Sequence, residues 1–111
     1  MKPTLGDAAK AFAEICTLGP IEGLRRWRSV TQFISTAIGG SELPDGVSFE
    51  FARTDAAMRS ILEFVRLECA CCPRLAYTIR PGSAPETIAL DIRSLGDSAP
   101  LKALYARFLP A

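Results

Sequence analysis

The sequence of 111 residues predicts an α+β fold: a small antiparallel sheet of two hairpins with helices packed on one face. Three observations lead to this prediction. Apolar residues alternate with other residues over 47–51, 75–79 and 88–92, which is the period of a half-buried strand. Residues 58–69 instead follow the helical period of 3.6. Turn-forming residues at 44–46 predict a hairpin just before the first of these strands.

The chain is long enough to bury one hydrophobic core that is stable without disulfides or bound metal ions. We therefore expect a single domain over residues 1–111, with an N-terminal helical segment at 1–18 and a core at 19–111. We find no internal repeat, low-complexity tract or linker in the sequence.

Composition limits the classes of partner. The chain is 49% hydrophobic and 23% charged, with a formal charge of +1, so it lacks the basic excess typical of proteins that bind nucleic acid or anionic membranes. It also contains no apolar run of signal-peptide or membrane-spanning length. These features predict a cytoplasmic protein whose thiols stay reduced, in which cysteines are ligands, redox groups or core residues rather than structural disulfides.

The first half of the chain predicts two helices. Asp7 can cap a short helix over residues 8–16. A second helix begins at Ile21 and either continues through residues 31–38 or gives way there to a β-branched strand. Its expected core-facing residues are Leu24, Trp27, Val30 and Ile34, and its expected outer face holds Arg25, Arg26 and Arg28.

The second half predicts a central helix over residues 54–68, capped by Thr54, and a last helix opened by Ser98 or Ala99 with Pro100. We expect Arg59 and Glu63 to pair on the outer face of the central helix. Its expected core stripe comprises Met58, Ile61, Leu62, Val65 and Cys69, and the core aromatics are predicted to be Trp27, Tyr77 and Tyr105.

The stretch 67–74, Leu-Glu-Cys-Ala-Cys-Cys-Pro-Arg, holds three of the four cysteines in a chain without histidine. A site here must use sulfur, and thiolates either bind soft metal ions or do redox chemistry. Cys69 is either a buried core residue or a ligand. Cys71 and Cys72 are adjacent, so at least one of them should face a cleft or solvent. Cys69 and Cys72 form a C-x-x-C at a helix C-terminus, where the helix dipole opposes a thiolate and disfavours thioredoxin-like catalysis.

Glu68 is a further candidate functional residue in this stretch, with a candidate catalytic role. Its position beside the apolar stripe allows three roles: a hard ligand, a proton carrier, or the partner of a nearby arginine. For the last of these, we expect Arg66 or Arg74.

The segments 43–51 and 67–73 resemble a family of small, poorly characterised bacterial proteins with a Leu-Glu-x-x-Cys-Cys-Pro motif, often associated with heavy-metal resistance. The resemblance covers roughly residues 16–92. It implies a site of Glu68, Cys71, Cys72 and, from a further cysteine near the N-terminus, Cys16. Arg74 stands where the family prefers phenylalanine, and Cys69 where it usually has a polar or charged residue.

Three functions remain open from the sequence. The first is a soft-metal protein in which Cys71 and Cys72, joined by Cys16 or Cys69, bind mercury, arsenite or monovalent copper. Zinc would need a fourth ligand that a chain without histidine does not readily supply. The second is a thiol-dependent enzyme that uses the vicinal cysteines, one attacking a substrate and the other resolving the product, with Glu68 as the proton carrier. The third is an interaction module with structural cysteines. No organic cofactor is implied.

Overall fold

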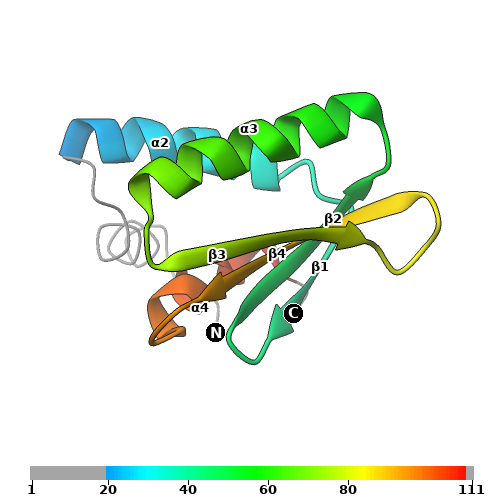
Figure 1. Ribbon diagram of the computed structural model, residues 1–111. Coiled ribbons are helices and arrows are strands. Elements are labelled where there is room, and N and C mark those ends of the chain that lie inside the picture. Colours follow the sequence, from blue (N-terminus) through cyan, green and yellow to red (C-terminus); the bar gives the residue numbers. More distant parts are fainter. Residues whose placement is uncertain (1–19, 110–111) are drawn as a thin grey trace.

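The computed structural model describes residues 20–109, which form three α-helices, four strands and a 3₁₀ turn (Figure 1). In chain order these are α2 (Pro20–Ile34), β1 (Gly39–Leu43), β2 (Gly46–Ala52), α3 (Asp55–Cys71), β3 (Leu75–Pro81), β4 (Thr87–Ser94), α4 (Ala99–Tyr105) and η1 (Ala106–Phe108). The helix predicted at residues 8–16 and the N-terminal segment 1–18 lie outside the described residues.

The four strands form one antiparallel sheet in the order β1-β2-β4-β3. Both predicted hairpins are present, β1 with β2 and β3 with β4. The two hairpins join through the central pair β2 and β4, in which Phe49 lies opposite Leu90 and Phe51 opposite Ile88. The predicted α+β class with an antiparallel sheet is therefore confirmed.

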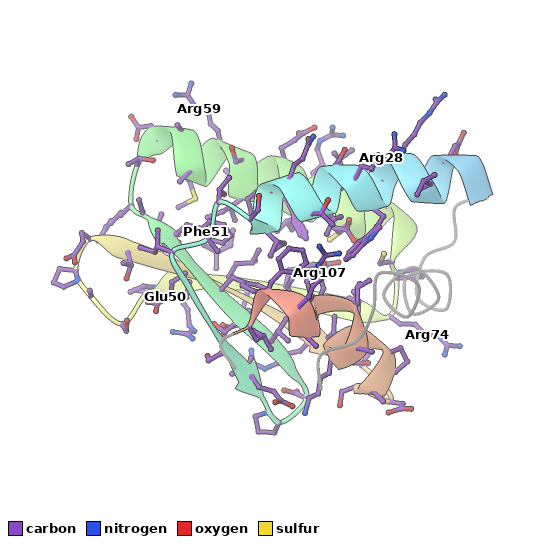
Figure 2. The ribbon with its side chains drawn as sticks, turned by 180° about the vertical axis from the view of Figure 1, so that it is seen from behind. Arg28, Glu50, Phe51, Arg59, Arg74 and Arg107 are labelled. Carbon is purple, nitrogen blue, oxygen red and sulfur yellow. The ribbon has the colours of Figure 1, made fainter. Side chains whose placement is uncertain are left out.

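The helices cover one face of the sheet. α2 and α3 run side by side across it, and α4 packs against β2 near the end of the chain (Figures 1 and 2). Tyr105 of α4 contacts the rings of both Phe49 and Trp27, with centroids 5.7 and 6.4 Å apart, so it shares the core with α2 and β2. The buried apolar side chains of this core are Trp27, Val30, Ile34, Val47, Phe49, Phe51, Ile61, Phe64, Cys72, Leu75, Ile88, Leu90, Ile92, Leu101, Leu104 and Tyr105.

The central helix α3 begins as predicted and ends three residues later than predicted. Thr54 caps it, because its hydroxyl accepts a hydrogen bond from the backbone N–H of Ala57 at 3.0 Å. The helix continues to Cys71, and the N–H of Cys72 still bonds to the carbonyl of Glu68 before Pro73 ends the pattern. Cys69 and Cys71 therefore lie in the last turn of the helix, and Cys72 is its C-cap.

The core stripe of α3 differs from the prediction at three positions. Leu62 and Cys69 were expected in the core, but Leu62 is half exposed and Cys69 is exposed, whereas Phe64 is buried. The outward pair expected between Arg59 and Glu63 is absent from the described ion pairs, because Glu63 bonds instead to Arg66, at 2.8 Å.

Helix α2 also differs from the prediction. Residues up to Ile34 stay helical and no strand forms at 31–38, since the chain turns before β1 begins at Gly39. Leu24 is half exposed rather than buried. Arg26 was expected on the solvated face, but its side chain points towards α3 and forms an ion pair with the buried carboxylate of Glu68.

The opposite face of the sheet carries polar side chains. Ser48 of β2 and Asp91 of β4 are paired across the strands and buried, and Arg80 of β3 lies over them. Within residues 20–109, no helix has the length and apolar character needed to cross a membrane.

Candidate functional site: a buried thiol and carboxylate at the end of α3

Glu68 and Cys72 lie four residues apart at the end of α3, so their side chains fall on the same side of the helix. The thiol of Cys72 donates to Oε2 of Glu68 across 3.2 Å. Both residues are buried, with exposed fractions of 0% for Cys72 and 1% for Glu68. A carboxylate so deeply buried needs a counter-charge or a proton, because isolated burial of a charge is strongly unfavourable.

Arg26 of α2 supplies that counter-charge. Its Nε donates to Oε1 of Glu68 at 2.9 Å, so the two oxygens of the carboxylate have different partners. The Arg26 side chain is 12% exposed, and its guanidinium also lies 5.9 Å from the ring centre of Phe64. The ion pair therefore joins α2 to the last turns of α3 across the edge of the core.

Tyr77 of β3 completes the surroundings of Glu68. Its hydroxyl is buried and makes no hydrogen bond of normal geometry within residues 20–109, although it is near enough to the carboxylate for the two groups to shift each other's pKa. Its ring packs edge-on against Phe64, with centroids 6.1 Å apart. A carboxylate, a thiol and a phenol thus share one poorly solvated space.

Burial raises the pKa of Glu68 above its usual range, although the charge of Arg26 and the contacts with Cys72 and Tyr77 act against that rise. Burial also raises the pKa of Tyr77, and the nearby negative charge of Glu68 raises it further. The phenol therefore stays protonated. Glu68 has one oxygen fixed by Arg26 and the other facing a thiol, a geometry in which a carboxylate can accept a thiol proton and return it.

The two cysteines whose side chains the structure describes lie in different environments. Cys69 is exposed, so the expectation that it fills the core is wrong; the longer helix carries it to the solvent side. Cys72 is buried. Cys71 ends α3, but the direction of its side chain is not described, so the expectation that one of the pair faces a cleft stays a prediction. Cys16 lies outside the described residues.

Two neighbouring side chains carry atoms of the kinds that bind metal ions: the soft Cys72 sulfur and the hard Glu68 oxygen. No cluster of three or more cysteine, aspartate or glutamate side chains suitable for a metal occurs in the part of the chain that the structure describes. Cys71, as the neighbour of Cys72, and either Cys16 or the exposed Cys69 remain the predicted further ligands.

Sequence reasoning missed Arg26 and misplaced the partner of Glu68, which is neither Arg66 nor Arg74. Three arginines stand close together at 25, 26 and 28, and nothing in their order distinguishes the one that turns inward. Tyr77 was expected in the core, and its alternation with Leu75 and Ile79 does indicate the covered face.

Comparison with protein-family models, curated protein sequences and solved structures finds no match to this chain. The resemblance carried by Glu68 and the paired cysteines therefore stays a prediction.

Proposed function

We propose that this protein binds a soft, thiophilic metal ion through the thiolate of Cys72 with Cys71 as the expected second sulfur, and that it serves metal handling or resistance. The observation that carries the proposal is the contact between the Cys72 thiol and Oε2 of Glu68, at 3.2 Å. A thiol must lose its proton before it binds a metal ion, and Glu68 is the acceptor in reach of that proton.

The surroundings of Cys72 favour a soft ion over a hard one. A hard cation such as magnesium prefers several oxygen ligands and keeps its water, whereas Cys72 lies buried in the apolar core with the single carboxylate of Glu68 beside it. Mercury, arsenite and monovalent copper accept two or three sulfurs, which fits a vicinal cysteine pair.

The test is titration of the reduced full-length protein with mercuric ion, arsenite and monovalent copper, read by calorimetry and by ultraviolet charge-transfer absorption. We expect about one equivalent bound, with release of roughly one proton per coordinating thiol. Cys72→Ser should lose most of the affinity. Cys69→Ser tests Cys69, the exposed cysteine of the same stretch, as the alternative further ligand.

Unchanged affinity in Cys72→Ser would contradict the proposal, whereas a loss of affinity in Cys69→Ser would add Cys69 to the site as a further ligand. A Cys71→Ser variant that binds like the natural chain would remove the second sulfur from the site. Protection of Cys16 from alkylation by bound metal would add it as a third ligand.

A second candidate is a thiol-dependent enzyme, favoured by the hydrogen bond that sets the thiol against a carboxylate already held by Arg26. With an activated acyl ester such as p-nitrophenyl acetate, the sulfur would form a thioester, the thiol proton would pass to Glu68, p-nitrophenolate would leave, and water would then release acetate. Multiple turnovers in metal-free buffer that stop in both Cys72→Ser and Glu68→Gln would favour this function over metal binding.

A further inference from the structure

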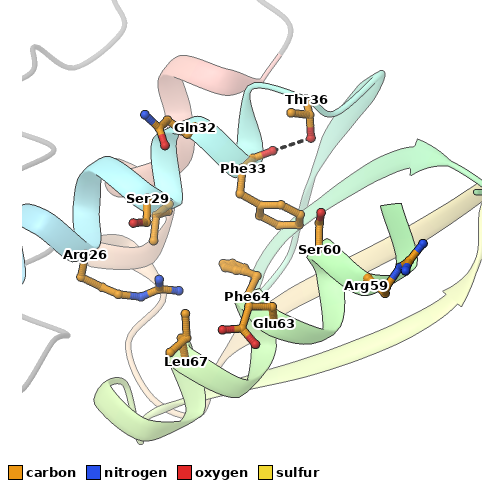
Figure 3. A pocket seen from close by; sticks show the side chains of 11 residues that line it. Arg26, Ser29, Gln32, Phe33, Thr36, Arg59, Ser60, Glu63, Phe64 and Leu67 are labelled. Atoms are coloured by element: carbon orange, nitrogen blue, oxygen red, sulfur yellow. Dashed lines mark hydrogen bonds between the residues drawn. The ribbon is translucent and has the colours of Figure 1, made fainter. Parts of the chain in front are cut away.

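A groove runs between α2 and α3 on the outer side of the helical layer, with a volume of about 570 Å³ (Figure 3). Phe33 and Phe64 meet in its floor, with ring centres 4.6 Å apart. Serine and glutamine side chains form part of its walls. The groove is thus an apolar trough with polar edges.

Each end of the groove carries an arginine. Arg26 lies beside Leu67 near the end of α3, and Arg59 lies near its start (Figures 2 and 3). Leu67 follows Arg59 by eight positions, which corresponds to about 12 Å along a helix. The two positive charges therefore flank the aromatic floor rather than cluster at one point.

The arginines of the groove keep guanidinium N–H donors available for a ligand. Glu63 also lines the groove, but Arg66 binds both of its oxygens, at 2.8 and 3.0 Å. Arg59 makes no ion pair with any residue in the range 20–109; its Nε only approaches the carbonyl of Asp55, at 3.4 Å. Arg26 uses Nε for Glu68, and within the same range its terminal amino groups have no assigned acceptor.

We propose that this groove binds an elongated organic anion with a flat apolar middle and an acidic group at each end. The apolar middle would lie on Phe33 and Phe64, one acidic group would pair with Arg59, and the other with the terminal amino groups of Arg26. Planar guanidinium groups suit carboxylates, which they can bind through two parallel hydrogen bonds.

Arg26 is fixed for this role before the ligand arrives. Its contact with the buried Glu68 and its position over the Phe64 ring hold the side chain at the groove edge. Because the Arg26 side chain is already held in place, ligand binding costs less of its side-chain entropy than binding to a mobile arginine would. The groove does not use a cysteine, so this inference stands apart from the metal proposal.

The test uses three probes of nearly the same shape: naphthalene-2,6-dicarboxylate, 2-naphthoate, and the neutral dimethyl ester of the diacid. Each is titrated into ¹⁵N-labelled full-length protein and followed by amide chemical shifts. We expect the dianion to bind most tightly and to shift amides at 29–36 and 59–67. Each lost charge should weaken binding by about 1.4- to fivefold, the range for exposed ion pairs.

Arg59→Gln should bring the affinity for the dianion down to that of 2-naphthoate. Arg28→Gln is the matched control, because Arg28 is exposed on α2 but does not line the groove. Ser60→Trp fills the groove without touching either arginine charge, and it should abolish binding of all three probes.

Several outcomes would overturn the proposal. One is equal affinity for the dianion and its neutral ester, and another is an equal effect of Arg28→Gln and Arg59→Gln. A third is a set of shifted amides outside the groove. Concentration-dependent dimerisation that Ser60→Trp removes would show that a second copy of the chain occupies the groove instead.

Discussion

The Sγ atom of Cys72 lies 3.2 Å from Oε2 of Glu68, so the last turn of α3 closes on a contact between a thiol and a carboxylate. Arg26 holds the other oxygen of the same carboxylate. Because the carboxylate is buried, its two partners are part of the stability of the domain as well as of its chemistry.

Arg26→Met should destabilise the domain by about 3–5 kcal/mol at pH 7.5, because the change leaves the carboxylate of Glu68 buried and unpaired. The double variant Arg26→Met/Glu68→Leu should recover most of this loss, since it removes the buried charge together with its partner. Urea unfolding of both variants and the natural chain measures the two values.

The loss of unfolding free energy caused by Arg26→Met should also depend on pH, and the pKa of Glu68 sets the sign of that dependence. The folded-state pKa of Glu68 is raised above the unfolded value of 4.5, so stability from this group is lost as the pH rises from 4.5 through the folded pKa. The cost of Arg26→Met should therefore shrink between pH 7.5 and pH 5. Equal unfolding free energies of the single and double variants, or a destabilisation by Arg26→Met that does not change with pH, would contradict the ion pair between Arg26 and Glu68.

The described cysteines should differ in reactivity by their burial. Cys69 is exposed and should react quickly with iodoacetamide in the native protein, whereas Cys72 is buried and should react only when the end of α3 opens. Peptide mass spectrometry after timed alkylation measures both rates. Cys69→Ser should change the unfolding free energy by no more than about 0.5 kcal/mol, and Cys72→Ala should lower it by about 1–3 kcal/mol. Equal alkylation rates would show that Cys72 is accessible.

Much of the fold followed from local patterns. Alternation at 47–51 and 88–92 predicted the central strands, and Thr54 predicted the start of α3. The order of the strands did not follow, because the pairing of β2 with β4 joins segments about forty residues apart, and no local pattern specifies it.

The candidate site was predicted only in part. Glu68 and the cysteine stretch were identified from residue types and spacing, but which side chains turn inward depends on where α3 ends. Its extension to Cys71 places Cys69 in solvent and Cys72 in the core. The partner Arg26 lies 42 residues away in the sequence, and only the packing of α2 against α3 brings it to Glu68.

Asp91→Asn should destabilise the domain by about 1–3 kcal/mol at pH 7, a value reduced from that of a fully buried pair because Arg80 is partly exposed. Ser48 donates to Oδ1 of Asp91 at 2.6 Å, and Arg80 donates to Oδ2 at 2.8 Å. Burial raises the pKa of Asp91, but the hydrogen bonds and charge of Arg80, with the bond from Ser48, together lower it below 3.8.

A lowered folded-state pKa means that this stability is present above pH 3.8 and is lost as the pH falls through the folded value. The difference in unfolding free energy between the natural chain and Asp91→Asn should therefore narrow below that pH. Glu86→Gln, at an exposed position in the turn before β4, is the control. A difference that stays constant down to pH 2.5 would mean that the Asp91 carboxylate contributes no charge interaction.

Two glycines provide a final test of how closely β2 and β4 pack. Gly46 begins β2 opposite Arg93, and a Cβ there would collide with the backbone carbonyl oxygen of Ile92. Backbone atoms of a central strand cannot rotate away as a flexible side chain can, so Gly46→Ala should cost about 2–4 kcal/mol. Gly96 has no atom within 4 Å of an added Cβ, so Gly96→Ala should be neutral or stabilise the domain by up to about 1 kcal/mol. Thermal and urea unfolding of the two variants measure both values, and similar effects at the two positions would contradict the pairing of β2 with β4 at this register.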